Sequence, residues 1–553
     1  MTAHFNRDAY REYFEKEFTW LSGFLNNVRR YSSKIALIDP VLQKKWSYSE
    51  LNTEAELLAG GFYSISKNKY DLVMIQMLNS EPFVACYIAA KKADLIPAPV
   101  NPRISASETA QILDTNKPVI YVYDAEISDT VTEALSMSEH KPSLIISVDY
   151  LNQKPVLPED HIFYDTYLSQ LKPCKELPEP SSTTFDESLR LQTSGTTGVS
   201  KSVPLTNINE ILSAHNLIMD LKMDETSVTM NLTPWFHRGG IHSTGPATSL
   251  YLGCTHVIMH HFSPNDALSH IEKYHVTHLT AVPSIFLLLS EILARKDAHP
   301  LGLEALLSMG SPLEREACIY IQKYLCKNIY NGYGTTESLW NLVLKPYVLP
   351  DRAGYTGKAN MDDDVRVVKL FNDRKAKPDE LAATDYSEIG EIIIKSPAKT
   401  AGCYIDEKEL TTDKYSDGWL YTGDLGVWDS DHYIKLISRK DDMIISLGEN
   451  IYPAAIEEIL NTHPFVSDSL VTSVPHEKKG ELIVAYIVPS SPELTITALI
   501  KYCAQNADLP AFKRPRLYRL VDDLPRTATG KKQHYIARKQ AVEDYKKGLF
   551  TRK

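Results

Sequence analysis

Short runs of apolar residues alternate with stretches of helical periodicity through much of the chain. In the first 180 or so residues, an apolar run at 72–77 is followed by a helix-like segment at 83–90. The alternation resumes over 205–330, where a helix is expected at 266–274 and a strand at 277–282. Because helices that alternate with buried strands pack on the faces of a parallel sheet, the pattern predicts two α/β units.

The pattern changes after about residue 350. Short β runs at 365–370, 390–394 and 433–437 are separated by Asp, Gly and Ser turns, which is typical of a small β-barrel. The segment 441–553 mixes strands with amphipathic helices and is long enough to fold alone. The chain therefore predicts an α/β multidomain protein. Its N-terminal domain, 1–440, has two helix-covered, mostly parallel sheets plus the barrel, and a small α+β domain follows.

Composition limits the class of protein. The chain has 553 residues, 43% of them apolar and 23% charged, as in globular proteins of more than one domain. A formal charge of −11 argues against a nucleic-acid partner, because a phosphate backbone needs a concentrated positive face. The N-terminus carries charge where a secretory signal needs an apolar core, and no apolar run approaches the roughly 18 residues of a membrane-spanning helix. The seven cysteines are scattered, as reduced thiols are. We expect a cytoplasmic protein without a membrane span.

The segment 193–203 concentrates groups that bind phosphate. Two glycines free the backbone, and hydroxyl side chains and Lys201 crowd around them. Backbone N–H groups and hydroxyls can donate to phosphate oxygens, while the lysine supplies positive charge. The spacing is not that of a Walker A loop. A flexible Ser/Gly/Thr linker is the alternative for this loop taken alone.

This loop resembles the phosphate-binding signature of the adenylate-forming superfamily, which includes acyl- and aryl-CoA synthetases, peptide-synthetase adenylation domains and firefly luciferases. Further segments resemble signatures of that family in the same order: 331–337, 421–424, 438–444, 448–453 and 524–531. The resemblance covers nearly the whole chain. It implies that the C-terminal domain is mobile and turns about a hinge at Asp441.

The resemblance implies a nucleotide site. Tyr333 would lie against the adenine, Thr336 would donate to the α-phosphate, and Glu337 would hold Mg²⁺, a cation that prefers oxygen ligands. Asp424 would accept both ribose hydroxyls, and Arg439 would reach the same ribose. Taken singly, such residues are more often a core tyrosine, a solvated carboxylate or an Asx turn. The nucleotide and CoA contacts implied are Thr193, Ser194, Gly195, Thr196, Thr197, Gly198, Lys201, Gly310, Ser311, Gly332, Tyr333, Thr336, Asp424, Arg439 and Gly448.

Lys531 completes the catalytic set that the resemblance implies, together with Thr336 and Glu337. Its charge would neutralise the charge that develops as the substrate carboxylate attacks the α-phosphorus of ATP. Mg²⁺-pyrophosphate then leaves, and the thiol of CoA displaces AMP from the acyl-adenylate. Two departures from the family pattern, Ser438 in place of a glycine and Lys532-Gln533 after the lysine, bear on the hinge and not on the reaction.

The resemblance also implies an acyl pocket. Gly334 stands where acetate-specific relatives carry a pocket-closing tryptophan, so larger acids should fit, and Trp340 would limit the depth. A medium-length, cyclic or aromatic acid is therefore expected. Arg238 could pair with substrate or CoA, or face solvent, and a tryptophan at 340 could be plain core. The pocket residues implied are His237, Arg238, Gly239, Ser308, Gly334, Leu339 and Trp340.

The acceptor of the acyl group is expected to be CoA. The sequence of segment 448–453 resembles that of acyl- and aryl-CoA ligases, in which this segment borders the pantetheine channel. The alternatives are a stand-alone adenylating enzyme that loads an acyl or amino acid onto a carrier protein, and a nucleotide-binding relative without catalysis. The partners expected are the acid, ATP and CoA, and a homodimer is compatible with the sequence.

Overall fold

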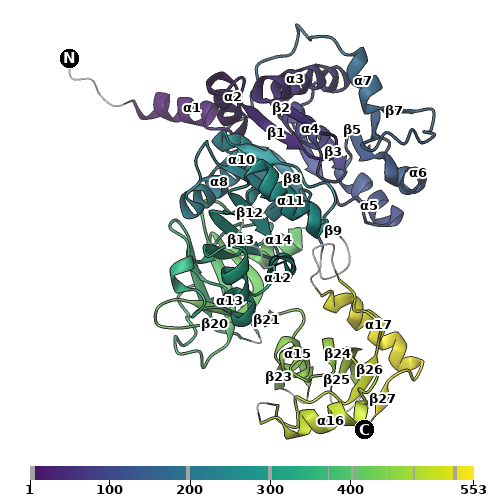
Figure 1. Cartoon of the computed structure of the whole chain (residues 1–553), viewed down its shortest axis with the longest axis vertical. Coiled ribbons are helices and arrows are strands. Elements are labelled where there is room, and N and C mark those ends of the chain that lie inside the picture. The colour runs from purple at the N-terminus through teal and green to yellow at the C-terminus, as the bar shows by residue number, and fades with distance from the viewer. Residues whose placement is uncertain are drawn as a thin grey trace. The chain divides into compact units, whose positions relative to one another are not determined.

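The protein forms two compact units (Figure 1). The computed structural model describes residues 6–194, 200–296, 302–371, 373–399, 404–405, 408–446, 449–476, 480–507, 509–526 and 532–552. The large unit holds Met1–Ser194, Ser200–Val365 and Ile394–Leu420, and most of the small unit is Arg366–Ile393 and Tyr421–Lys553. The expected division between residues 440 and 441 concerns domain movement and stays a prediction.

The first sheet of the large unit is parallel throughout. Its order is β4-β3-β5-β6-β7, and each neighbouring pair is parallel. The strands are β3 (Leu72–Gln76), β4 (Ile96–Pro99), β5 (Ile120–Asp124), β6 (Leu144–Val148) and β7 (His161–Phe163). The chain passes from β3 to β4 on one side and then to β5 on the other, so the connections change direction between β3 and β5.

The second sheet has nine strands, in the order β16-β15-β14-β13-β12-β10-β11-β1-β2. Neighbours from β14 to β1 are parallel, and the edges are antiparallel. The strands are β1 (Ile35–Asp39), β2 (Lys44–Ser47), β10 (Val228–Asn231), β11 (Thr255–Val257), β12 (His278–Ala281), β13 (Ala305–Met309), β14 (Ile329–Tyr333), β15 (Leu342–Leu344) and β16 (Lys358–Ala359). The prediction of two mostly parallel sheets is confirmed.

Helices join and cover these strands. Several begin with a local signal, such as Ser47 and Glu50, which bond to each other's backbone in a capping box at the start of α3. Among the described residues, no helix combines the length and apolarity needed to cross a membrane. The α-helices of this part are α1 (Arg7–Glu17), α2 (Trp20–Arg30), α3 (Tyr48–Ile65), α4 (Glu81–Lys92), α5 (Ala106–Asn116), α6 (Ser128–Met137), α7 (Tyr164–Gln170), α8 (Asn207–Leu221), α9 (Arg238–His242), α10 (Pro246–Leu252), α11 (Pro264–Tyr274), α12 (Pro283–Arg295), α13 (Arg315–Tyr324) and α14 (Lys408–Lys414), with 3₁₀ turns η1 (Ala125–Ile127) and η2 (Pro346–Val348).

A hairpin, a five-stranded sheet and a six-stranded sheet complete the fold. A hairpin is formed by β8 (Glu187–Ser194) and β9 (Ser200–Thr206). Where the sequence predicted a barrel, a five-stranded sheet has the order β17-β18-β20-β19, with β21 paired to β20. Its strands are β17 (Asp364–Val368), β18 (Gly390–Lys395), β19 (Tyr415–Ser416), β20 (Trp419–Trp428) and β21 (Ile434–Arg439).

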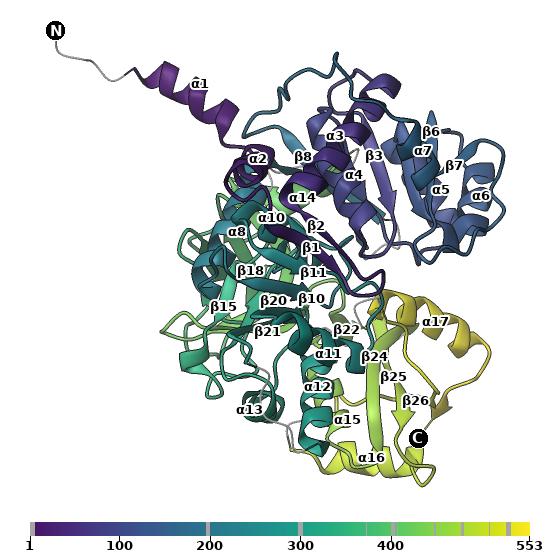
Figure 2. The same ribbon diagram turned by 45° about the horizontal axis from the view of Figure 1, so that its top comes forward.

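The C-terminal part of the small unit is a six-stranded sheet with helices, as the mixed pattern predicted. Figure 2 shows its long strands β24 and β25 side by side, and α15 and α17 pack against β24. The elements are β22 (Ile444–Ser446), β23 (Glu449–Ile451), α15 (Pro453–Asn461), β24 (Val466–His476), β25 (Gly480–Pro489), α16 (Ile496–Gln505), β26 (Leu517–Leu520), α17 (His534–Lys546) and β27 (Thr551–Arg552).

Candidate active site

Two adjacent strands of the nine-stranded sheet end in predicted site residues. Strands β13 and β14 are parallel, with Ser308 opposite Asn331 and Met309 opposite Gly332. Gly310, with φ of +92°, turns the chain after β13, a conformation that suits a residue without Cβ. The structure therefore brings Ser308, Gly310, Ser311, Gly332 and Tyr333 to one edge of the sheet.

The loop that follows β14 is a tight turn. The N–H of Thr335 donates to the Ser338 carbonyl over 2.9 Å, and the N–H of Asn341 donates to the Tyr333 carbonyl over 2.9 Å. Thr336 and Glu337 lie at the tip and are half-buried. The turn thus presents a hydroxyl and a carboxylate side by side at the carboxyl edge of a parallel sheet, the usual place for ligands in α/β folds.

The side chain of Arg238 holds this turn by donating to one of its backbone carbonyls. The side chain is 2% exposed. It donates from Nη1 to the Thr336 carbonyl (2.6 Å) and from Nη2 to Ser213 Oγ (3.0 Å) and the Ala398 carbonyl (3.3 Å). Burial lowers the pKa of Arg238 to about 10, against the opposing charge of Glu337. The solvent-facing alternative for Arg238 is therefore wrong, because desolvation and three acceptors fix the guanidinium inside the protein.

Glu337 is held by a second partner. The hydroxyl of Tyr404 donates to Glu337 Oε1 over 2.5 Å. Among the described residues, no three or more His, Cys, Asp or Glu side chains gather as a metal site. Mg²⁺ is commonly held by one or two carboxylates together with substrate phosphates and water. A half-buried carboxylate at the tip of this turn fits a Mg²⁺ ion that arrives with a nucleotide and takes its other ligands from phosphate and water.

Helix α9 is placed against β13 by the end of β10. Asn231 Nδ2 donates to the carbonyls of Gly239 (3.2 Å), Gly240 (3.0 Å) and Ser243. A Cβ on Gly240 would lie 1.8 Å from the Pro234 carbonyl oxygen, so glycine is required there. Among the described residues, a Cβ on Gly239 would have only Met309 Sδ near it, at 4.0 Å. These contacts bring His237, Arg238 and Gly239 to the same edge as Ser308.

A buried ion network supports α9. Lys91 Nζ lies 2.7 Å from Glu210 Oε1, and His242 Nε2 lies 3.5 Å from Glu210 Oε2. Burial opposes the charge of Glu210, but Lys91 and His242 hold its pKa at about 2. Tyr87 and Ser188 also donate to Glu210. Sequence reasoning missed this network, because its members come from separate elements and form no motif.

Trp340 lies in the core. The side chain is fully buried, and its indole N–H donates to Asp220 Oδ2 over 2.7 Å. A Cβ on Gly332 would lie 1.9 Å from the indole ring, so the ring packs directly on that glycine. A Cβ on Gly334 would lie 2.6 Å from the Trp340 backbone nitrogen, and Leu339 is 2% exposed. The core alternative for Trp340 is thus favoured, and a side chain at 334 would meet backbone before it reached any pocket.

The predicted phosphate loop joins the two strands of a hairpin. Thr193 lies opposite Lys201, and Ser194 lies opposite Ser200. Thr193 Oγ1 donates to the Lys201 carbonyl over 3.5 Å. Gly195, Thr196, Thr197 and Gly198 lie outside the described residues. The hairpin places Thr193 and Lys201 together at the base of the loop.

In the small unit, Asp424 and Arg439 face each other across β20 and β21. They are directly opposite in the antiparallel register. Arg439 Nη1 lies 3.3 Å from Asp424 Oδ1, with side chains 43% and 8% exposed. The N–H of Asp424 donates to Thr422 Oγ1 over 3.0 Å. The two residues predicted to bind ribose are therefore brought together by strand register, and Arg439 reaches solvent.

Lys531 and Gly448 lie outside the described residues, but the flanks of Lys531 are clear. Arg526 and Lys532 form an antiparallel bridge. Lys532 Nζ lies 2.8 Å from Asp468 and 3.0 Å from Glu457. Lys532 appeared in the sequence only as a departure from the family pattern, and the structure shows that it pairs with two carboxylates of the small unit.

The predicted hinge residue, Asp441, is exposed and lies in the turn after β21. His534 Nε2 lies 2.7 Å from Glu457 and His534 Nδ1 lies 3.8 Å from Asp442. Burial opposes protonation of His534, but its hydrogen bond to Glu457 and the nearby negative charge raise its pKa. The residue next to the predicted hinge thus belongs to the ion cluster that fixes Lys532.

Comparison with known proteins decides the family. A family model described as AMP-binding enzyme matches residues 24–405, and the corresponding C-terminal domain model matches residues 455–531. The chain belongs to the AMP-binding enzyme family. The predicted superfamily, its fold and the prediction of an AMP-forming enzyme are confirmed.

Similar AMP-binding enzymes are CoA ligases. The chain is 28% identical over 510 residues to the long-chain-fatty-acid–CoA ligase FadD13 of Mycobacterium tuberculosis, covering 91% of this chain and 95% of that one. It is 26% identical over 515 residues to a peroxisomal benzoate–CoA ligase of Arabidopsis thaliana, covering 88% of each. The solved o-succinylbenzoate CoA synthetase of Bacillus subtilis with AMP matches with a TM-score of 0.78 and 24% identity, covering 93% and 97%. At the level of the family, the predicted ATP-dependent ligation of an acid to CoA, with ATP, Mg²⁺ and CoA, is confirmed.

Proposed function

We propose that this AMP-binding enzyme activates a compact carboxylic acid, aromatic, cyclic or medium-length, and transfers it to CoA. The observation that carries the choice of acid is the position of Trp340. Although the ring belongs to the core, it packs directly on Gly332, so it would form the back of a pocket that reaches this glycine, and it would lose its hydrogen bond to Asp220 if it moved aside to open a deep channel. Relatives named for benzoate and 2-succinylbenzoate support the same choice.

The adenylation half-reaction is proposed to occur at the edge formed by β13, β14 and α9. The acid's carboxylate attacks the α-phosphorus of ATP, the bond to pyrophosphate breaks, and an acyl-adenylate forms. Thr336 would donate to the α-phosphate, and Lys531 would offset the charge that develops there. Mg²⁺, when bound with the nucleotide, would neutralise phosphate charge. Glu337 would supply its protein oxygen ligand.

The remaining nucleotide contacts are proposed in the same way. Tyr333 would stack on adenine, while the Asp424 carboxylate would accept the ribose hydroxyls beside Arg439. Thr193, Ser194, Lys201 and the loop between them would cradle the phosphates, next to Gly310 and Ser311. His237, Gly239 and Ser308 would border the acid. Arg238 would serve mainly to hold the turn, because Nη1 and Nη2 already donate to Thr336, Ser213 and Ala398, while its Nε has no hydrogen-bond partner among the described residues.

The thiolysis half-reaction is proposed to need a second domain orientation. The C-terminal domain would turn about Asp441 and bring Gly448 to the CoA thiol, which attacks the acyl carbon and releases AMP. The exposed position of Asp441 after β21 suits a pivot. A carrier-protein acceptor is the alternative. The cytoplasmic location and the homodimer stay predictions.

A panel of acids tests this proposal. Benzoate, cyclohexanecarboxylate, butyrate, octanoate and palmitate would each be offered with ATP and either CoA or a holo carrier protein, while AMP and the thioester are measured. We expect the cyclic and medium-length acids to exceed palmitate in kcat/KM by roughly tenfold or more, since an acid longer than its pocket is excluded by overlap. Palmitate as the best acid would overturn the compact pocket. AMP release that occurs with the carrier protein and not with CoA would overturn the choice of CoA as the acceptor.

A further inference from the structure

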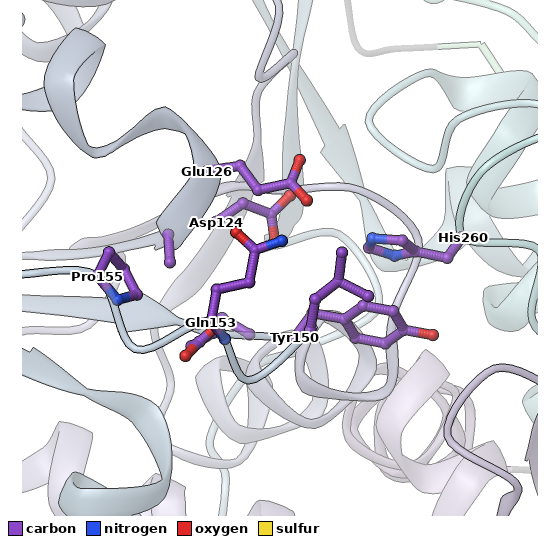
Figure 3. A pocket seen from close by; sticks show the side chains of 10 residues that line it. Asp124, Glu126, Tyr150, Gln153, Pro155 and His260 are labelled. Carbon is purple, nitrogen blue, oxygen red and sulfur yellow. The ribbon is translucent and has the colours of Figure 1, made fainter.

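A crevice at the carboxyl edge of the parallel sheet β4-β3-β5-β6-β7 contains none of the residues assigned above (Figure 3). Its empty space, counted together with the solvent at its open mouth, is about 350 Å³. Its wall includes Asp124, Glu126, Tyr150, Gln153, Pro155 and His260. All belong to the large unit.

The crevice lies where the strand connections change direction. β4 lies on one side of β3 and β5, the next strand in the chain, lies on the other, and most of the wall residues come from the ends of β5 and β6 and the segments that follow them. The N–H of Leu78, just after β3, donates to Oδ2 of Asp124 at the end of β5 over 2.7 Å. Crevices at such switch points are where open α/β sheets bind ligands.

Asp124 has an oxygen without a partner. The residue is 5% exposed, and among the described residues Oδ1 has no hydrogen-bond partner. Figure 3 shows its side chain pointing into the crevice beside that of Glu126. Burial, together with the charge of Glu126, raises the pKa of Asp124 to about 7. A buried carboxylate oxygen of this kind calls for a donor, and a cationic donor would favour its ionised form.

His260 offers the crevice an acceptor. Its Nδ1 lies 2.8 Å from the Asn79 carbonyl, which can only accept, so Nδ1 carries the proton and Nε2 presents a lone pair. Burial lowers the pKa of His260 to about 4, so the ring is neutral near pH 7. Tyr150 stacks on His260 at 3.8 Å, and its hydroxyl is committed to Asp39 at 2.9 Å.

We propose that this crevice binds a small organic cation, an alkylammonium or a guanidinium compound, whose charged head is held by Asp124 and Glu126 and whose hydrocarbon part lies along Tyr150 and Pro155. The wall is rich in acceptors, and the Gln153 amide can donate as well as accept. No cluster of three metal-ligating side chains occurs in the described part of the chain, which favours an organic cation over a metal ion. None of the wall residues belongs to the ligase site described above.

Calorimetric titration of the full-length protein tests the proposal. The probes are n-butylammonium and methylguanidinium, and n-butanol is the uncharged control. We expect saturable binding of a cation and none of butanol. Asp124→Asn should weaken binding roughly tenfold or more, because a charge-assisted hydrogen bond is lost. Glu133→Gln, on an exposed position of α6, changes the net charge equally and should leave binding unchanged.

The pH dependence gives a second readout. Only ionised Asp124 attracts a cation, so affinity should rise with pH through the carboxyl pKa of about 7, by about tenfold between pH 6 and pH 8. The other titratable groups of the crevice wall are Glu126, Asp149, Tyr150 and His260; burial raises the pKa of Tyr150 and lowers that of His260, which moves both away from this pH range. If Asp124→Asn does not fold, Glu126→Gln, at the exposed mouth, should weaken binding several-fold. Butanol binding as tightly as the amine, or no saturable cation binding up to roughly 50 mM, would overturn the proposal and leave a water-filled crevice.

Discussion

Glu337 and Asp424 are presented to a nucleotide in different ways. Glu337 lies on a turn that is held from far away in the sequence, by Arg238, which reaches the Thr336 carbonyl across 98 residues, and by Tyr404, 67 residues on. Asp424 lies inside β20, opposite Arg439 of the next strand. The first position depends on buried side chains and the second on a strand ladder.

The difference predicts how each region responds to substitution. A loop fixed by a buried cation should lose both position and stability when that cation is removed, because the carbonyls it served stay buried without a donor. A pair fixed by register keeps its backbone when a side chain changes, and an ion pair whose arginine reaches solvent is weakened by solvent screening. Removing the cation that holds the turn should therefore lower both activity and stability. A substitution in the β20–β21 pair should lower activity with little change in stability.

The largest effect is expected for Glu337→Gln. Without the carboxylate, adenylation measured by acid-dependent ATP–pyrophosphate exchange should fall by roughly 10²–10³-fold, as when a group that stabilises the transition state is lost. The melting temperature should hardly change, because the side chain is only half-buried. Full exchange activity in this variant would remove Glu337 from the proposed Mg²⁺ site.

Arg238→Met should come next and affect both properties. Leaving the Thr336 and Ala398 carbonyls without their donor should cost about 1–3 kcal/mol of unfolding free energy for each unsatisfied group and slow adenylation by roughly 10–10²-fold. The Mg²⁺ concentration for half-maximal rate should rise, since Glu337 sits on the displaced turn. Arg238→Lys, which keeps one charged donor, should recover part of each effect. If stability falls while the Mg²⁺ requirement stays unchanged, Arg238 contributes to packing and does not position Glu337.

Asp424→Asn tests the other side of the comparison. The KM for ATP should rise by roughly tenfold, because an amide replaces an acceptor-only carboxylate facing the ribose. The unfolding free energy should change by less than about 1 kcal/mol. A large drop in melting temperature would show that the β20–β21 pair depends on this side chain after all.

The smallest effect on activity is expected for Trp340→Phe, behind the turn. Asp220 loses the indole donor but keeps Lys345 at 2.7 Å and Asn360 at 3.0 Å. Stability should fall by about 1–2 kcal/mol, and kcat/KM for a compact acid should change only a few-fold. Efficient use of palmitate by this variant would sharpen the proposal, because it would show that the ring sets the depth of the pocket.

The fold and the site differ in how much the sequence revealed. Alternating β and helical periods predicted both sheets, because those patterns arise from local burial. Asp424 and Arg439 were predicted from their separate motifs to contact the same ribose, and the register of β20 and β21 brings them together. Arg238 could not be placed, because its acceptors lie on three distant elements. Asn231 is a buried anchor of α9 that the sequence patterns did not single out, and only the folded structure reveals that role.

The central claim is that the enzyme forms an acyl-adenylate on its way to acyl-CoA. The most direct measurement uses the best acid from the panel, labelled with ¹⁸O in both carboxylate oxygens, and mass spectrometry of the nucleotide released with CoA. Attack of the carboxylate on the α-phosphorus, followed by attack of the thiol on the acyl carbon, predicts AMP that carries one ¹⁸O atom. Label-free AMP, or release of ADP and labelled phosphate, would contradict the account.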